Sequence, residues 1–276
     1  MNLFKKLQFE KPLIMGVLNV TPDSFSDGGN FLDVNKACDR ALQMVEEGAD
    51  IIDIGGESTG PGSTDVSLDE ELQRVIPVIE KVRSKIDLPI SIDTYKSSLA
   101  LHAINIGVDL VNDVTAMRSD AEMANVLAKY DLPVVLMYSK DLSPRTTNES
   151  VQYDDVMMTI KGFLKERIEY GMRAGIKRER FIVDPGMGAF VSAEAVYSLQ
   201  ILNRLNELLE LELPILIGAS RKSFIGKVLD LPKDQRLQGS LACAAVAVLS
   251  GASIIRAHDV KETRRVLDII DAIKKS

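Results

Sequence analysis

Residues 12–29 read PLIMGVLNVTPDSFSDGG, and this stretch sets the pattern that the rest of the chain repeats. Residues 13–20 are almost all aliphatic, which is typical of a strand that is buried on both faces in a parallel sheet. One polar residue, Asn19, lies near the end of this run, and a loop rich in hydroxyls, carboxylates and glycines follows. The stretch therefore predicts a buried strand whose carboxyl end opens into a polar loop.

The same unit, an apolar run followed by a polar loop and an amphipathic helix, recurs along the chain. Strands are expected at residues 13–20, 50–54, 89–93, 109–114, 133–138, 181–184, 214–220 and 253–258. Helices are expected at residues 34–47, 68–82, 97–106, 121–130, after the loop 139–150 up to about 173, 193–209, in two parts up to 250, and 260–274. Eight such units predict an α/β fold, a single-domain (β/α)₈ TIM barrel over residues 1–276.

Three helix starts carry local signals. Ser67 with Glu70 three residues later forms a capping box, and Asp33 and Asp259 are each placed to cap the helix that follows. No GxGxxG or GxxxxGK[ST] sequence is present, which disfavours an open sheet that binds nucleotides.

Composition narrows the function. The chain of 276 residues has a net charge of −7, which argues against nonspecific binding to nucleic acid or to an anionic membrane. An anionic substrate would therefore need a local cluster of positive groups. Cys38 and Cys243 lie in apolar helical patterns without zinc-like spacing. No secretory or membrane-spanning apolar run is found, so a cytoplasmic enzyme is expected.

Polar side chains gather at the expected carboxyl ends of the strands, where barrels of this kind carry their active sites. They are Asn19, Glu57, Thr59, Asp93, Asn112, Asp113, Asp184, the turn Ser220–Lys222, Arg256 and His258, while the fifth strand ends in Met137 and Tyr138. Arg256 and His258 are two residues apart and so share one face of their strand. Asp113 is expected to have a structural role.

This set of groups suits a flat heterocycle that carries a diphosphate. Two carboxylates and an amide can pair with the donor-rich edge of an aminopyrimidinone ring, and Lys222, Arg256 and His258 can neutralise phosphate oxygens. Asn19 and oxygens of the substrate could hold Mg²⁺. No Ser-His-Asp order or metal-hydrolase cluster is evident, which favours a displacement driven by stabilisation of the leaving group.

Several stretches together resemble the dihydropteroate synthase family over nearly the whole chain. They are MGVLNVTPDSFSDGG, DIGGESTGPG, SIDT, VNDV, VDPGMG, SRKSFIG, GSLA and IIRAHDVKET, in this order. The resemblance implies condensation of 6-hydroxymethyl-7,8-dihydropterin diphosphate with p-aminobenzoate, giving 7,8-dihydropteroate and pyrophosphate in folate biosynthesis. It also implies a TIM barrel, a Mg²⁺ requirement and a homodimer formed through the late helices.

The resemblance also implies a role for particular residues. The pterin would be bound by Asp93, Asn112, Met137, Asp184, Gly218 and Lys222, and the diphosphate by Asn19, Arg256 and His258, with Asn19 also contacting the metal. The p-aminobenzoate would be bound by Thr59, Pro61, Phe190, Lys222 and Ser223. Asp27 and Thr59, on two loops that close over the site, would stabilise the cation left when pyrophosphate departs, so Asp27, Thr59 and Lys222 form the expected catalytic set.

Two departures from the family pattern fall in the expected p-aminobenzoate subsite. The family usually has an arginine where this chain has Gly60, and an aromatic residue where it has Ala189, with Phe190 one place later. The stretch MGAFVS resembles sulfonamide-insensitive members around residues 184–192. The hypothesis is that Phe190 partly replaces the missing aromatic and that sulfonamides bind weakly. Ordinary variation with normal drug sensitivity is the alternative.

Two other functions remain open from the sequence. A pterin-binding methyltransferase that passes a methyl group to a corrinoid protein shares the expected barrel, but the TPDSFSDGG loop and the SRKS and RAH segments argue for a diphosphate that a methyl donor lacks. A noncatalytic pterin-binding paralogue is made conceivable by Gly60 and Ala189.

Overall fold

Parallel strands and helices alternate along the chain in the computed structural model, which describes residues 11–21 and 30–276. The strands are β1 (Leu13–Asn19), β2 (Ile51–Gly55), β3 (Ile90–Asp93), β4 (Leu110–Asp113), β5 (Val134–Met137), β6 (Phe181–Asp184), β7 (Leu216–Ile217) and β8 (Ile254–Ala257). They form one eight-stranded sheet in the order β6-β5-β4-β3-β2-β1-β8-β7. A single parallel bridge between Val183 and Ile215 joins the two outer strands. The sheet is therefore closed into the predicted barrel.

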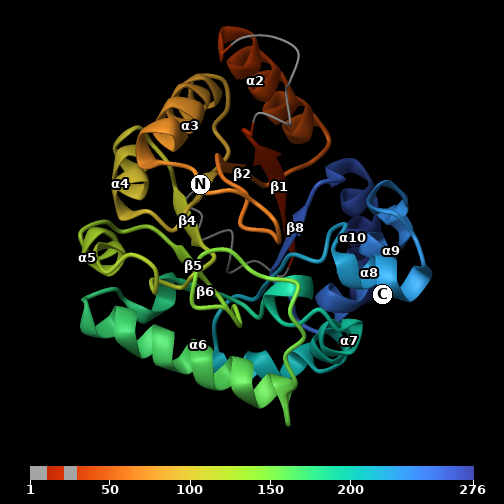
Figure 1. Ribbon diagram of the computed structural model, residues 1–276. Helices are drawn as coiled ribbons and strands as arrows, with labels where there is room; N and C mark the ends of the chain where they lie inside the picture. Colours follow the sequence, from red (N-terminus) through yellow and green to blue (C-terminus); the bar gives the residue numbers. More distant parts are fainter. Residues whose placement is uncertain (1–10, 22–29) are drawn as a thin grey trace.

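Helices surround the sheet on its outer side (Figure 1). They are α2 (Asn30–Glu46), α3 (Leu68–Arg83), α4 (Ser97–Asn105), α5 (Glu122–Ala128), α6 (Val156–Arg173), α7 (Ala195–Asn203), α8 (Ser223–Leu229), α9 (Leu237–Leu249) and α10 (Val260–Lys275). Short 3₁₀ turns are η2 (Arg178–Arg180), η3 (Gly188–Phe190), η4 (Leu205–Leu211) and η5 (Lys233–Gln235). This arrangement confirms the (β/α)₈ TIM barrel.

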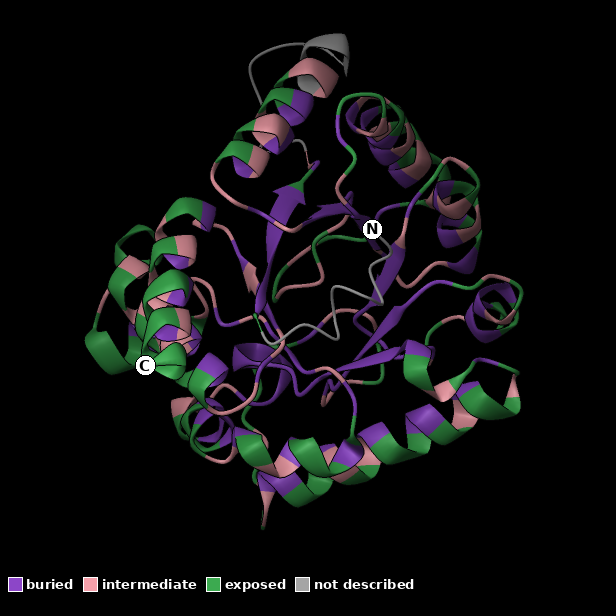
Figure 2. Ribbon diagram, turned by 180° about the vertical axis from the view of Figure 1, so that it is seen from behind, coloured by how far each residue is buried: buried purple, intermediate pink, exposed green. Residues whose placement is uncertain are grey.

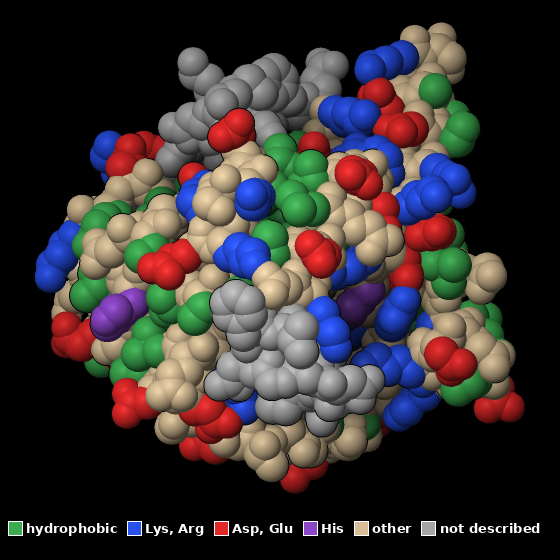
Figure 3. Space-filling view, turned by 90° about the horizontal axis from the view of Figure 1, so that it is seen from above, with side chains coloured by type: hydrophobic (Ala, Val, Ile, Leu, Met, Phe, Trp, Pro, Cys, Tyr) green, Lys and Arg blue, Asp and Glu red, His purple; other side chains and the backbone are tan. Residues whose placement is uncertain are grey.

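Burial follows the two layers of the barrel. The strands are buried along most of their length, whereas the helices alternate between buried and exposed residues (Figure 2). On the face seen in Figure 3, acidic and basic side chains are interspersed. Within residues 11–21 and 30–276, no helix is both long enough and apolar enough to cross a membrane.

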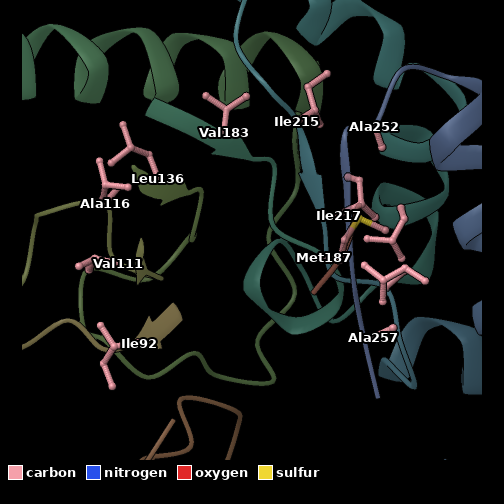
Figure 4. Close-up of a cluster of buried hydrophobic side chains, with 14 of the residues drawn as sticks. Ile92, Val111, Ala116, Leu136, Val183, Met187, Ile215, Ile217, Ala252 and Ala257 are labelled. Atoms are coloured by element: carbon pink, nitrogen blue, oxygen red, sulfur yellow. The ribbon is translucent and has the colours of Figure 1, made fainter. Parts of the chain in front are cut away.

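Alternate residues of each strand face opposite sides of the barrel wall. One set, which includes Ile92, Val111, Leu136, Val183 and Ile217, packs against the helices (Figure 4). The other set fills the barrel interior with a separate apolar cluster. It consists of Leu13, Met15, Ile51, Leu110, Val135, Ile182, Leu216 and Ile254.

The alternation along each strand also fixes which side chains form the next interior layer, above this apolar cluster. Two residues further along their strands or strand ends come Asp53, Asn112, Met137, Asp184, Gly218 and Arg256. Strand pairing aligns this layer, because Met137 is opposite Asp184 and Asn112 is opposite Asp93, the last residue of β3. Polar interior side chains thus collect at the carboxyl ends of the strands, where the sequence predicted the site.

Local expectations about helix ends were met in part. Ser67 caps α3, because its side chain accepts a hydrogen bond from the backbone N–H of Glu70 at 3.2 Å. The prediction for Asp33 was wrong, since α2 begins at Asn30 and Asp33 lies inside it. Asp259 occupies the N-cap position of α10 but makes no side-chain capping bond. Its carboxylate instead binds the guanidinium of Arg221, which is a stronger, charged partner.

The helix expected at residues 193–209 is shorter than predicted and is divided. The α-helical part, α7, ends at Asn203, and the chain continues as the 3₁₀ turn η4. Arg204 marks the change, and its guanidinium binds both carboxylate oxygens of Asp155 at 3.0 Å. Because Asp155 is 49 residues away in the sequence, the apolar period could not reveal this contact.

Candidate active site

A cavity with about 430 Å³ of empty volume opens at the carboxyl ends of the strands. Its lining consists of Thr59, Asp93, Asn112, Val114, Met137, Asp184, Met187, Phe190, Gly218, Lys222 and Arg256. All of these except Val114 and Met187 were singled out from the sequence. The lining mixes apolar walls with a few charged groups, as small-molecule sites commonly do.

Arg256 is the centre of a charge cluster on the cavity floor, in which Asp53 is fully buried and Arg256 and Asp93 are mostly buried. Its Nε donates to Asp53 Oδ2 at 2.7 Å, and its Nη2 donates to Asp93 Oδ2, also at 2.7 Å. Asn112 Nδ2 donates to the same Asp53 oxygen at 3.2 Å. Burial raises the pKa of Asp93 to about 7, with the charge of Asp53 adding to the effect and Arg256 opposing it. The guanidinium therefore holds two carboxylates together in a region of low dielectric constant.

Asp53 is a member of this cluster that the sequence reading missed. It is fully buried in the middle of β2, and it does not line the cavity itself. From the sequence, only the polar residues at the end of each strand were considered, so Asp53 was not included. A carboxylate inside a run of isoleucines was a usable signal, because a buried charge needs a partner.

Asp184 and Lys222 form a second pair of opposite charge across the cavity. Burial raises the pKa of Asp184 to about 6, and hydrogen bonding by the Gly186 N–H, at 2.8 Å, and the charge of Lys222 oppose that rise. Burial lowers the pKa of Lys222 to about 8, against the effect of Asp184. Burial thus shifts the pKa values of both groups towards neutral pH.

The turn after Asp184 depends on a glycine. Gly186 has a φ of +68°, and a Cβ at this position would lie 2.3 Å from the backbone oxygen of Tyr138. No other residue type fits that space without a shift of the backbone. This close approach fixes the carboxyl end of β6 against β5.

Phe190 lies beside Lys222 in the cavity lining. The Nζ of Lys222 is 4.5 Å from the centroid of the Phe190 ring, and the ring packs with Val114 and Met137. Ala189 does not line the cavity. An aromatic surface is thus supplied by Phe190 and not by residue 189, as hypothesised. Weak sulfonamide binding stays a prediction.

His258 lies near the floor but is not among the residues that line the cavity. Ser220 Oγ accepts a hydrogen bond from the His258 backbone N–H at 3.2 Å and is 3.0 Å from its ring Nδ1. Burial lowers the pKa of His258 to about 3, and the positive charges of Arg256 and Arg221 add to this effect. The imidazole is therefore a neutral hydrogen-bonding group, and the expected set of three cations is reduced to Lys222 and Arg256.

Some expected site residues lie outside the cavity. Asn19 is exposed at the end of β1, opposite Gly55 in the strand register, and therefore lies at the barrel mouth. Pro61 lines a neighbouring groove, and Ser223 begins α8 directly after Lys222. Asp27 lies outside the described residues. The described part of the chain holds no group of three or more His, Cys, Asp or Glu side chains suited to a metal.

Asp113 has the structural role that was expected of it. Its Oδ1 accepts from the N–H and the hydroxyl of Thr115, both at 2.8 Å, and its Oδ2 accepts from the Met117 N–H at 2.7 Å. Ala116 and Met117 have φ angles of +52° and +61°. The carboxylate therefore stabilises a strained turn below the cavity, and its oxygens are occupied.

The chain has many relatives of one kind. A family model described as pterin binding enzyme matches residues 15–258. The dihydropteroate synthase of Haemophilus influenzae is 45% identical over 97% of this chain and 96% of its own. A crystal structure of a dihydropteroate synthase from Clostridium difficile, in the presence of pteroic acid, superposes with a TM-score of 0.89 at 46% identity, covering 96% of this chain and 98% of the other.

A third comparison includes the second expected substrate. The structure of the Xanthomonas albilineans dihydropteroate synthase with 4-aminobenzoic acid has a TM-score of 0.89 and 40% identity, and the match covers 98% of this chain and 95% of the other. At this level of identity over nearly full length, the likeness extends beyond the fold.

Proposed function

Because this chain belongs to the pterin-binding enzyme family and acts as a dihydropteroate synthase, we propose that its cavity is where the reaction takes place. There, 6-hydroxymethyl-7,8-dihydropterin diphosphate condenses with p-aminobenzoate to give 7,8-dihydropteroate and pyrophosphate. The observation that carries this assignment is the presence of Asp93, Asn112, Asp184, Lys222 and Arg256 in one cavity.

The pterin ring lies between the polar strand ends and the apolar walls. Asp184 and Asn112 pair with the ring nitrogens and the amino group, because a carboxylate only accepts and an amide both donates and accepts. Asp93 adds a second acceptor that Arg256 orients from below. Met137, Met187 and Val114 provide the flat apolar contacts that such a ring requires.

The charged tail of the pterin substrate faces the two cations. Lys222 and Arg256 stabilise the negative charge that grows on the diphosphate as the bond from the pterin methylene carbon to oxygen breaks. The electron pair leaves with pyrophosphate, and the neutral imidazole of His258 contributes a hydrogen bond near the floor. Thr59 and Asp27 stabilise the cation that remains on the pterin.

Asn19 has the chemistry of a magnesium ligand. Mg²⁺ is commonly bound through one or two protein oxygens together with phosphate oxygens of a substrate, and the exposed Asn19 amide at the barrel mouth suits that arrangement. Asn19 would hold Mg²⁺ with oxygens of the diphosphate, and the metal would supply charge neutralisation for the departing group.

The p-aminobenzoate approaches on the Phe190 side. The Phe190 ring offers an aromatic surface, Lys222 and Ser223 can bind the carboxylate, and Thr59 and Pro61 belong to the loop above. The amine nitrogen then forms a bond to the methylene carbon and releases one proton. No strong base is required, because the carbon is already electron-poor when the amine attacks.

An assay of pyrophosphate release tests this function. The purified protein is mixed with the pterin diphosphate, p-aminobenzoate and Mg²⁺, and pyrophosphate and dihydropteroate are both quantified. We expect equal amounts of the two products. Pterin binding without turnover would contradict the proposal and would favour the noncatalytic paralogue.

We also propose that the enzyme is a homodimer through its late helices. Exposed apolar side chains occur on all four helices from α7 to α10, and these helices are grouped on one side of the barrel (Figure 1). They are Val196, Leu199, Val228, Leu229, Val246, Leu249, Ile269 and Ile273. A second copy that packs through the same surface would cover these side chains. Sedimentation equilibrium measures the mass that decides this.

A further inference from the structure

Arg145 joins two loops that are far apart in the sequence. It lies between β5 and α6, and its guanidinium forms ion pairs with Glu57 and, at 2.9 Å, with Asp65. Both carboxylates belong to residues 56–67, the loop between β2 and α3. Arg145 does not line the cavity, and none of the roles proposed above uses it.

Glu57 is the point at which the contacts of this loop converge. Its side chain is only 3% exposed. Lys96 Nζ donates to it at 2.6 Å, and the Tyr95 hydroxyl is 3.2 Å from both of its oxygens. The same Lys96 Nζ also binds Glu71 and the backbone oxygen of Val66, each at 2.6 Å. Glu57 therefore keeps buried partners even if Arg145 is removed.

The residue after Arg145 continues the connection as far as the cavity. The Thr146 N–H donates to the backbone oxygen of Thr59 at 3.0 Å. The Thr146 hydroxyl lies 2.9 Å from the backbone oxygen of Ala189 and 2.7 Å from Asp141 Oδ2, and it can donate its one proton to either acceptor. Thr59 and Phe190, the neighbour of Ala189, both line the cavity. Arg145 and Thr146 thus lie between two segments, those of Thr59 and Phe190, that form the side of the cavity proposed for p-aminobenzoate, here called the amine side.

The loop of residues 56–67 has little internal support of its own. It contains glycine at positions 56, 60 and 62, and Gly62 has a φ of +79°. Hydrogen bonds within this loop connect residues 58, 60 and 63. Glycine-rich segments have a large conformational entropy, so a fixed position for Thr59 must come from contacts outside the loop.

We propose that Arg145 is a positioning residue for the second substrate: its ion pair with Glu57 holds Thr59 and Pro61 over the amine side of the cavity and so sets the affinity for p-aminobenzoate. This inference rests on the proposed function. The pterin floor does not depend on Arg145, because Asp53, Asp93 and Arg256 are held by the strands and by one another. Loss of Arg145 should therefore affect one substrate and spare the other.

The test compares Arg145→Gln and Arg145→Lys with two control variants. Asp65→Asn removes the other, 83% exposed partner, and Arg173→Gln removes an exposed ion pair on α6. For Arg145→Gln we expect the KM for p-aminobenzoate to rise about tenfold or more, since small misplacements of substrate-positioning groups are costly. The Kd for 6-hydroxymethylpterin should change by about twofold at most, as should both constants in the controls.

The lysine variant separates positioning from simple loss of structure. Arg145→Lys keeps the charge near Glu57, so we expect it to recover most of the p-aminobenzoate affinity. Equal losses for both substrates in Arg145→Gln, with a lower melting temperature and no recovery by lysine, would overturn the proposal. An unchanged KM for p-aminobenzoate in Arg145→Gln would do the same.

Hydrogen exchange provides a readout that does not depend on turnover. Peptides covering residues 56–67 and 141–150 should exchange faster in Arg145→Gln than in the wild type or in Arg173→Gln. If the wild type fails to make dihydropteroate, the proposed function falls, whereas exchange still decides whether Arg145 restrains the loop. Equal exchange rates in the wild type and Arg145→Gln would reject the restraint itself.

Discussion

The floor and the rim of the cavity are stabilised in different ways. The floor consists of Asp53, Asp93 and Arg256, whose positions follow from strand register and whose charges are buried together. The rim consists of the loops 56–67, 139–150 and 188–193, which are joined through Arg145, Thr146 and neighbouring side chains. The difference supports the proposed roles, in which the floor would bind the pterin ring and the rim would position the amine substrate.

The largest effect is expected when Asp53 and Asp93 lose Arg256, the cation that donates a hydrogen bond to both of them. Arg256→Ala leaves Asp53 and Asp93 buried without their guanidinium, and we expect a loss of about 3 kcal/mol or more in the free energy of unfolding. Pterin binding should fall below detection by calorimetry. Urea denaturation measures the stability, with Arg173→Ala as the exposed control. If Arg256→Ala were as stable as that control, the floor would not be the buried charge cluster described here.

A pH-dependent effect of intermediate size is expected at Asp184. Its pKa is raised from 3.8 to about 6, so the stabilisation that comes from its proton is complete below about pH 4 and is lost as the pH rises through 6. Asp184→Asn should therefore be more stable than the wild type at pH 8, by about 1 to 3 kcal/mol, and should bind pterin poorly.

Unfolding free energies measured at several values between pH 4 and pH 8 check this prediction. The difference between Asp184→Asn and the wild type should shrink towards zero at the acid end. A difference that is constant over this range would show that Asp184 titrates normally. Such a result would mean that burying the Asp184 carboxylate costs the protein no stability.

The smallest effect on stability is expected at Ser67, where the loop 56–67 ends and α3 begins. Ser67→Ala removes the cap of α3, whose first turn also holds Glu71, the partner of Lys96. We expect a loss of about 1 kcal/mol of stability with an unchanged Kd for pterin. Thermal melting and calorimetry measure the two quantities. A weakened pterin affinity in Ser67→Ala would mean that floor and rim are coupled after all.

The same division explains what could be read from the sequence. Asp93, Asn112, Asp184 and Arg256 were predicted correctly as cavity residues, because the alternation along a strand fixes which side chains share a face. Asp53 was missed because it lies one layer below the strand end. A carboxylate within a buried strand needs a partner, and this rule would have predicted that Asp53 belongs to the charge cluster.

The contacts that hold the rim together could not be predicted from alternation along the strands. Arg145 lies in a segment that reads only as a polar loop, and its partner Glu57 is 88 residues earlier in the chain. Asp259 was expected to cap a helix, but Arg221, 38 residues away, binds it. Ser67 was predicted correctly because its partner is three residues away. Contacts between distant loops have no periodic signature, and only the folded chain reveals them.

The barrel wall has a seam. β6 and β7 share one bridge, between Val183 and Ile215, whereas β1 and β2 are paired at five successive positions. Asp184 ends β6 on one side of this seam, and Lys222 follows β7 on the other side. Because one bridge joins β6 to the chain just before β7, backbone pairing sets the spacing of these two charged groups less firmly than it sets the spacing of groups on β1 and β2.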